Sequence, residues 1–280
     1  MKLGTILVHL DPSQRCAVRV ELAAALAKKH GSHLIGLIPT GLYDSSIPAD
    51  ALAPGGPGFM AASAEYLRKR AEAMADAFRR MMQASGTASF DIRATDAPSV
   101  DAVVRHGRTS DLVVLGQSGG DDTEGMTARN LPEQATIHTG RPVLIVPRSW
   151  PLQAVGGRIL VAWDGSRESA VALQASLPLL AGAAAVSLVS LREEGEAADA
   201  GALQISPALA WLNRHGIRAE AEQHTTATGT AEALLFHAAR MSADLLVMGA
   251  YGHPRLRELM LGGVTRDMLA RMNLPVLMAH

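Results

Sequence analysis

Cysteine is almost absent from this 280-residue sequence, which contains only Cys16. A disulfide within the chain is therefore impossible, and zinc sites built from several cysteines are excluded. Such sparing use of cysteine fits a reducing compartment, so we expect a cytoplasmic protein. The first residues, MKLGTILVHLDPS, hold too short an apolar run for a signal peptide, which agrees with that expectation.

The sequence also lacks an excess of charge of either sign. Its 26 Lys and Arg residues nearly balance 27 Asp and Glu residues, which gives a net charge of −1. No basic field is available to hold a nucleic acid backbone, so we expect no nucleic acid partner. The uncharged stretch 170–191 is interrupted by Pro178 and Gly182, which predicts a helix, a turn and a buried strand rather than a membrane span.

Several well-known catalytic motifs are missing as well. The sequence has no G-x-x-x-x-G-K-[ST] loop, no G-x-G-x-x-G after a strand, and no H-E-x-x-H pair among its 10 histidines. We therefore expect no catalytic residue and no metal-binding residue. What the chain does have is apolar material, with 48% hydrophobic residues, which is enough for a core. Its length favours two domains.

The chain repeats itself in three blocks that occur in the same order in both halves. The first block is offset by 159 − 6 = 153 residues, and the other two by 244 − 111 = 133 and 275 − 142 = 133 residues. The first half therefore carries about 20 extra residues, which we expect in the segment 41–64, rich in Gly, Pro and Ala. The matched blocks are Ile6–Asp11 with Ile159–Asp164, Asp111–Gly116 with Asp244–Gly249, and Pro142–Pro147 with Pro275–His280.

A Pro- and Gly-rich segment, residues 148–157, separates the two halves. We therefore predict two domains, residues 1–148 and residues 157–280. In each half, continuous apolar runs alternate with helical spacing, which indicates parallel strands covered by helices on both faces. The predicted fold class is α/β, with two repeated, doubly wound, Rossmann-like domains of five strands each. In the second half, strands are expected at 158–162, 185–191, 218–226, 244–248 and 275–279, and helices at 168–180, around 211–215, and at 231–241 and 263–272.

The most informative motif begins where the strand 244–248 ends. It has the spacing Gly249-x2-Gly252-x9-Gly262, and Gly263, Val264 and Thr265 then open a helix. Glycines let the backbone approach a phosphate closely, and the free N–H groups of a helix start favour an anion. The same glycines could instead serve only to end the strand and to allow tight packing. The spacing of the glycines fits both interpretations.

This motif, before a short helix and a final strand, resembles the nucleotide-binding signature of the universal stress protein family. The resemblance covers both halves, and it implies a tandem member with an adenine nucleotide alpha hydrolase-like fold. In that family, Ser or Thr usually follows the third glycine, whereas this chain has Gly263 there. The resemblance implies ATP or a related adenine nucleotide, with or without Mg²⁺, in the second half.

The resemblance also assigns roles to residues of the second half. Asp164 would contact the ribose or the adenine edge, and Leu191 would line the adenine pocket. Gly249 and Gly252 would admit the ribose and phosphates. The phosphates themselves would be held by Gly262, Gly263, Val264 and Thr265.

The first half departs from the motif. Gly116 and Gly119 are present, but Arg129 and Asn130 stand where the second half has Gly262 and Gly263. We therefore expect weak or no nucleotide binding there. The leading interpretation is a stress-response regulatory protein that binds nucleotide in its second domain. The alternatives are a slow ATPase, for which only Glu258 and Asp267 offer carboxylates near the loop, and an interaction protein without a functional site.

The last strand of each half is expected to pair the two domains. Residues 143–146 and 276–279 are short apolar runs that end their domains, and a terminal edge strand must be covered or paired. Two such edges in one chain can pair with approximate two-fold symmetry. Universal stress proteins commonly dimerise through this strand, so the resemblance implies a pseudo-dimer within the chain, alone or as part of a homodimer.

Overall fold

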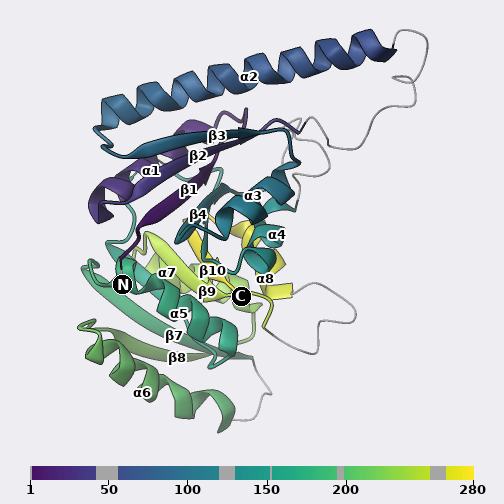
Figure 1. Cartoon of the computed structure of the whole chain (residues 1–280). Helices are drawn as coiled ribbons and strands as arrows, with labels where there is room; N and C mark the ends of the chain where they lie inside the picture. Colours follow the sequence, from purple (N-terminus) through teal and green to yellow (C-terminus); the bar gives the residue numbers. More distant parts are fainter. Residues whose placement is uncertain (1, 42–55, 120–129, 152, 194–198, 253–262) are drawn as a thin grey trace. The chain divides into compact units, whose positions relative to one another are not determined.

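A computed structural model describes residues 2–41, 56–119, 130–151, 153–193, 199–252 and 263–280 (Figure 1). The chain divides into two compact units. The N-terminal unit comprises residues 3–114 and 118–135, and the C-terminal unit comprises residues 1–2, 115–117 and 136–280. The units therefore do not coincide with the two sequence repeats, because the end of the first repeat is grouped with the second.

The N-terminal unit is built on parallel strands in the order β3-β2-β1-β4. Strands β1 and β2 are buried along most of their length, as expected for continuous apolar runs between two layers of helices. Strand β3, at the edge of the unit, is only half-buried and alternates polar with apolar residues. The strands are β1 (Thr5–His9), β2 (His33–Pro39), β3 (Phe90–Thr95) and β4 (Leu112–Gly116).

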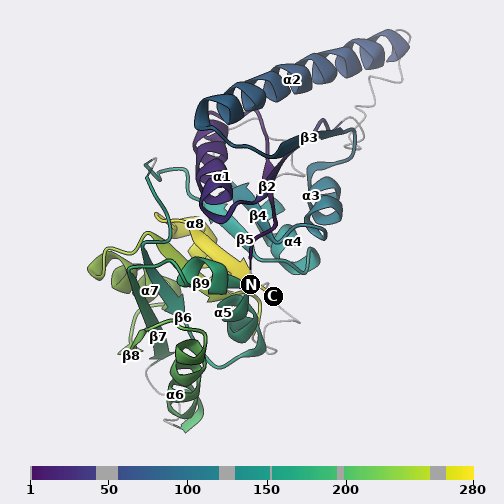
Figure 2. The same cartoon turned by 60° about the vertical axis from the view of Figure 1, so that its left-hand side comes forward.

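Helices α1 (Cys16–His30), α2 (Gly56–Ser85) and α3 (Ser99–Gly107) connect these strands. Helix α2 has 30 residues, and Figure 2 shows it as one long, continuous rod. It begins inside the expected insertion 41–64, so residues 56–64 of that insertion are helical. Residues 42–55 of that insertion lie outside the described residues. Within the described residues, no helix combines the length and the apolar character needed to cross a membrane.

The C-terminal unit contains the strand order β5-β10-β9-β6-β7-β8. The strands from β10 to β8 are parallel, and their order is that of a doubly wound sheet. Strands β9 and β10 are apolar and almost fully buried. The strands are β5 (Val143–Val146), β6 (Arg158–Ala162), β7 (Ala185–Glu193), β8 (Glu220–Thr226), β9 (Leu245–Gly249) and β10 (Val276–Ala279).

Helices cover both faces of this sheet, and Figure 2 shows α5 and α7 on opposite sides of β6 and β7. Helix α6 packs on β7 and β8, and α8 packs on α7. The predicted α/β fold with doubly wound, mostly parallel strands is confirmed. The helices are α5 (Arg167–Leu180), α6 (Asp199–Arg214), α7 (Thr230–Arg240) and α8 (Gly263–Arg271), and α4 (Leu131–His138) precedes β5.

Strand β5 explains why the unit boundary departs from the repeat boundary. It pairs antiparallel with β10, with Leu144 opposite Leu277 and Ile145 opposite Val276. All four residues of each strand are buried. The hydrogen bonds of this ladder bring the end of the first repeat into the C-terminal unit.

An aspartate at the start of a buried strand recurs at matched positions of the two repeats. The Asp111 carboxylate accepts hydrogen bonds from the backbone N–H groups of Gly4 and Thr5, both at 2.8 Å. The Asp244 carboxylate accepts from Gly156, Gly157 and Arg158 at 2.7–3.1 Å. Both repeats therefore use an aspartate to accept hydrogen bonds from the backbone N–H groups where β1 and β6 begin.

We expect Asp244→Ala to lower the free energy of unfolding by about 2 kcal/mol, because three backbone N–H groups lose a charged acceptor. Urea denaturation monitored by circular dichroism measures this change. Asp267→Ala, an exposed change on α8, is the control and should shift stability by less than about 0.5 kcal/mol. Equal effects of the two substitutions would contradict the role of Asp244 as the acceptor for the N–H groups at the start of β6.

Candidate functional site

The carboxyl ends of β6 and β9 form the switch point of the C-terminal unit. These two strands pair in parallel, and the chain leaves them in opposite directions along the sheet. In doubly wound sheets, ligands bind outside the carboxyl ends of the strands at this position. Asp164 follows β6, and Gly249 ends β9, so the sheet brings these two predicted site residues to one edge.

Asp164 shapes the start of helix α5. Its Oδ1 atom accepts hydrogen bonds from the Ser166 backbone N–H at 2.9 Å and from the Ser166 hydroxyl at 2.6 Å. Ser166 is in turn the N-cap of α5, and its hydroxyl accepts from the Ser169 N–H at 3.1 Å. Asp164 is itself exposed at the edge of the sheet. It thus combines a capping role with access to a ligand.

Gly249 allows the first turn of α5 to lie against the end of β9. A Cβ atom at this position would lie 2.6 Å from the backbone carbon of Glu168 and 2.6 Å from the nitrogen of Ser169. Such contacts cannot be relieved by a side-chain movement, because both atoms belong to the backbone. The glycine is therefore required for helix packing, which is the second of the two interpretations that the spacing left open.

Glu168 is the acidic residue of this site that the sequence analysis missed. It lies in the first turn of α5 and is only 8% exposed. A Cβ atom at Gly252 would be 2.7 Å from its Oε2 atom, so the acidic group lies directly against the glycine turn. Arg167 contacts the other carboxyl oxygen at 3.3 Å. Glu168 and Gly252 are 84 positions apart in the sequence, so they become neighbours only in the folded chain.

The turn after β9 is tied to the start of α8. Tyr251 has a left-handed backbone with a φ of 61°, and its N–H donates to the hydroxyl of Thr265 at 3.3 Å. Thr265 is buried, whereas Gly263 at the helix start is exposed. Among the residues that the structure describes, which leave out 253–262, no atom lies within 4 Å of a Cβ atom built at Gly263. No described residue therefore packs against Gly263 at the start of α8.

The remaining predicted site residues lie on β7, on α8 or outside the described residues. Leu191 is half-buried in β7, and Val264 is half-buried in α8. Gly262 and Glu258 lie outside the described residues. Asp267 is exposed on α8.

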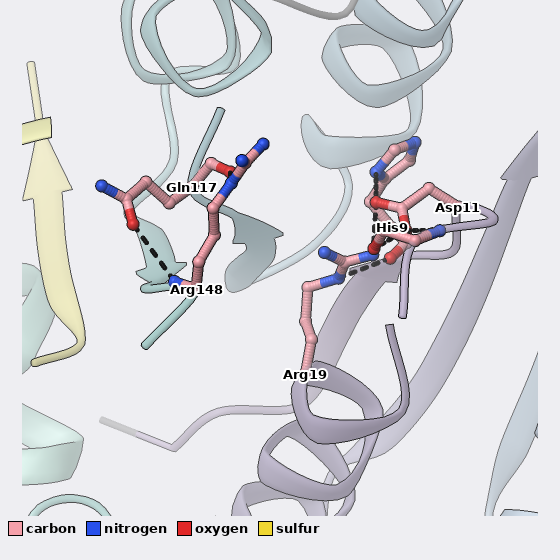
Figure 3. Close-up of polar contacts among 6 residues, drawn as sticks. His9, Asp11, Arg19, Gln117 and Arg148 are labelled. Atoms are coloured by element: carbon pink, nitrogen blue, oxygen red, sulfur yellow. Dashed lines mark hydrogen bonds and ion pairs between the residues drawn. The ribbon is translucent and has the colours of Figure 1, made fainter. Parts of the chain in front are cut away.

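The N-terminal unit has a different arrangement after β1. Asp11, the counterpart of Asp164, forms an ion pair with the Arg19 guanidinium at 2.6 Å (Figure 3). Arg19 is only 2% exposed, and its Nε also donates to the His9 carbonyl at 2.9 Å. Burial tends to raise the pKa of Asp11, but the charges of Arg19 and His9 hold it below its usual value. This carboxylate is therefore engaged within the chain.

His9 lies beside this ion pair and is 4% exposed. Its Nδ1 atom is 3.6 Å from the Asp11 carboxylate. Burial lowers the pKa of His9 to about 4, although Asp11 acts in the opposite direction and Arg19 adds to the decrease. The imidazole is consequently neutral at pH 7.

The two repeats differ in the residue at the position of Arg19. With the offset of 153 residues, Arg19 corresponds to Ala172 in the second repeat. Asp164 consequently has no buried arginine at the position that neutralises Asp11. The same topology thus carries an internally neutralised aspartate in one half and an exposed aspartate in the other.

Comparison with known proteins identifies the second half. The family model for the universal stress protein family matches residues 157–280. These residues form a universal stress protein domain. A universal stress protein from Synechocystis sp. is 29% identical over 175 residues, which cover 60% of this chain and 57% of the relative. The chain thus spans little more than half the length of this curated relative.

Solved structures extend the likeness in fold to both halves. A universal stress protein from Archaeoglobus fulgidus has a TM-score of 0.76 and 16% identity, and the match covers 99% of this chain and 96% of that one. A protein from Pseudomonas aeruginosa has a TM-score of 0.57 and 17% identity, with coverage of 99% and 93%. At this level of identity, the likeness establishes the fold. The family resemblance read from the glycine motif is confirmed for the domain that carries it.

The buried His9 predicts a pH dependence of stability. The folded state holds the pKa of His9 near 4, below its ordinary value of about 6.5, so the unfolded state binds the proton more readily. The contribution of His9 to stability is present above pH 6.5 and is lost as the pH falls towards 4. We expect about 3 kcal/mol to disappear over this window.

His9→Gln should flatten this pH dependence in urea denaturation measured at several pH values. His138→Gln is the control, because His138 is exposed at the end of α4. If the wild type and His9→Gln lose the same stability between pH 6.5 and 4, the neutral state of His9 does not contribute.

Proposed function

We propose that the protein is a cytoplasmic stress-response regulator that binds ATP or a related adenine nucleotide in its second half only. The observation that carries this proposal is the contrast between the two switch points. Asp11 is engaged by a buried arginine, whereas Asp164 is exposed, and no described residue packs against Gly263 at the start of α8. The first half would then serve as a degenerate universal stress protein domain.

The start of α8 supports the proposed phosphate site. The helix has nine residues, and the N–H groups of its first turn have no partners within the helix. Gly263 is exposed, and a Cβ atom there would contact none of the residues that the structure describes. The backbone of Gly263, Val264 and Thr265 would therefore offer donors to an anion, together with Gly262 from the preceding loop. An accompanying Mg²⁺ would arrive with the phosphates.

The remaining groups would orient the nucleoside. Asp164 is a hydrogen-bond acceptor for ribose hydroxyls, and the half-buried Leu191 offers an apolar surface for adenine. The carboxylate of Glu168 would repel a bound phosphate, because it lies against Gly252. The affinity for ATP would thus be limited by a residue of the protein itself.

Gly263→Glu should weaken ATP binding at least tenfold, because it places a carboxylate where the phosphates are proposed to bind. Folding should be preserved, since Gly263 is exposed and a Cβ atom there would contact none of the described residues. Isothermal titration calorimetry of the full chain measures the effect. Wild-type binding in the micromolar range corresponds to about −8 kcal/mol, with one site per chain.

Asn130→Glu is the matched control, because Asn130 is the counterpart of Gly263 and is exposed. It should leave the ATP affinity unchanged. Two equal sites per chain, or an unchanged affinity in Gly263→Glu, would overturn the proposed site. Absence of any binding would favour an interaction protein without a functional nucleotide site.

Slow ATP hydrolysis is the second candidate, and the position of Glu168 is the observation that favours it. An acidic side chain beside the glycine turn could orient an attacking water. Glu168→Gln separates the two functions. A regulator would bind ATP more tightly after this substitution, because a repulsive charge is removed. An ATPase would lose turnover.

We also propose that the two sequence repeats associate within one chain through β5 and β10. Gln117, which follows the last strand residue of β4, supports this association. Its Nε2 donates to the Leu269 carbonyl at the end of α8 at 2.7 Å. Its Oε1 accepts from the Arg148 N–H at 3.1 Å (Figure 3). Residues of the first repeat thus contact the helix that follows the proposed nucleotide loop.

A designed disulfide tests this association. Leu144→Cys with Leu277→Cys, in a Cys16→Ser background, joins two residues that face each other across the ladder. Oxidation should give a faster-migrating monomer on nonreducing electrophoresis at any protein concentration.

Leu144→Cys with Met278→Cys is the control, because successive residues of a strand point to opposite faces and this pair should stay reduced. A disulfide-linked dimer in place of the monomer would point to pairing between chains and would overturn the intramolecular arrangement.

A further inference from the structure

Away from the switch point, one acidic residue and two histidines of the C-terminal unit gather on the sheet. Glu222 and His224 are two residues apart on β8, so their side chains share one face of the sheet. His237 reaches the same face from α7. One ligand atom from each of the three lies within 4.8 Å of the others. None of these residues belongs to the proposed nucleotide site.

The distances suit a small metal ion. The Nε2 atom of His224 is 2.8 Å from Oε2 of Glu222, and the Nδ1 atom of His237 is 4.0 Å from that same oxygen. Zinc binds nitrogen and oxygen ligands at about 2.0–2.2 Å, so a tetrahedral site separates its donor atoms by about 3.3–3.6 Å. The two observed separations bracket this value. Small rotations of the side chains would therefore complete the site.

The electrostatic environment of Glu222 and His237 also suits a cation. Desolvation lowers the pKa of His237, and the charges of His224 and Arg240 lower it further. The hydrogen bond from His224 lowers the pKa of Glu222. A neutral imidazole and an ionised carboxylate are the forms that bind metals. The rings of His224 and His237 stack with centroids 4.1 Å apart, which disfavours two positive charges.

A cleft of about 560 Å³ leads to this cluster, with Glu222 and His237 in its wall. The side chains of Glu222 and His224 keep 40% and 33% of their surface exposed, whereas that of His237 keeps 10%. An ion could therefore enter from solvent and meet a buried ligand. Other charged residues also line the cleft, namely Arg158, Arg218, Glu220 and Arg240.

The first repeat provides an internal comparison. Strands β3 and β8 end at Thr95 and Thr226, and helices α3 and α7 begin at Ser99 and Thr230, an offset of 131 residues in both cases. With this offset, Glu222, His224 and His237 correspond to Asp91, Arg93 and His106. An arginine thus replaces one ligand in the first repeat, and the pKa of His106 is lowered first by burial and then by the charge of this arginine. The complete donor set is present in the second repeat only.

We propose that Glu222, His224 and His237 bind one divalent zinc-type metal ion, with at least one coordination position left to water. The sequence analysis predicted no metal-binding residue, because these three are separated by 2 and 13 positions and form no known motif. Only the packing of α7 on the sheet brings His237 to β8. This site is independent of the proposed nucleotide function.

Zinc titration of tag-free, full-length protein, stripped with a chelator and free of nucleotide, tests the proposal. A chromophoric chelator in competition should report one Zn²⁺ per chain with micromolar or tighter affinity. His224→Ala and His237→Ala should each weaken binding at least tenfold. Glu222→Gln should do the same while preserving the shape of a partly exposed side chain. Arg240→Gln should tighten binding severalfold, because it removes a nearby positive charge.

His106→Ala is the matched control and should leave the zinc affinity unchanged. Circular dichroism checks that every variant is folded, and histidine ring resonances give a second measurement on the wild type. One equivalent of Zn²⁺ should shift the signals of His224 and His237 before those of other histidines. Unchanged affinity in Glu222→Gln and His224→Ala, or an equal loss in His106→Ala, would overturn the proposal.

Discussion

Strand β10 ends a parallel ladder, and its outer edge would expose a row of backbone N–H and C=O groups if it had no partner. Strand β5 satisfies that edge by antiparallel pairing, and both strands are fully buried as a result. Because β5 belongs to the first sequence repeat, this single ladder determines where the compact units divide. It also places Gln117 against the end of α8, which is the helix that opens the proposed nucleotide site.

The two repeats show how one topology supports different chemistry. Both place an aspartate after the first strand of the repeat, at the edge where ligands bind in doubly wound sheets. In the first repeat a buried guanidinium neutralises that aspartate, and removal of either partner would leave a buried charge uncompensated. In the second repeat, Ala172 replaces the arginine, and Asp164 remains exposed. The two repeats thus keep the same strand order but place different residues beside the aspartate that follows their first strand.

Glycines of the family motif serve more than one purpose in this chain. Gly249 is required by the approach of the α5 backbone, so its presence alone does not indicate a ligand. At Gly263, by contrast, a Cβ atom would contact none of the described residues, so packing among those residues does not require a glycine there. The position of Glu168 against Gly252 adds an opposing charge. In the proposed site, helix N–H groups that favour a phosphate would be opposed by this one acidic side chain.

The sequence by itself determined the α/β class, the duplication and most element boundaries of the second half, because these depend on local apolar periodicity and on spacing. Strand β6 begins and ends where the apolar run predicts, α5 and α8 differ from expectation by one residue at one end, and α7 is displaced by one residue at both ends. The contacts of Arg19 with Asp11, of Glu168 with Gly252 and of His237 with β8 were decided by the tertiary structure. Charged and polar side chains carry no periodic signal of their partners, and these partners become neighbours only when strands and helices distant in sequence pack together.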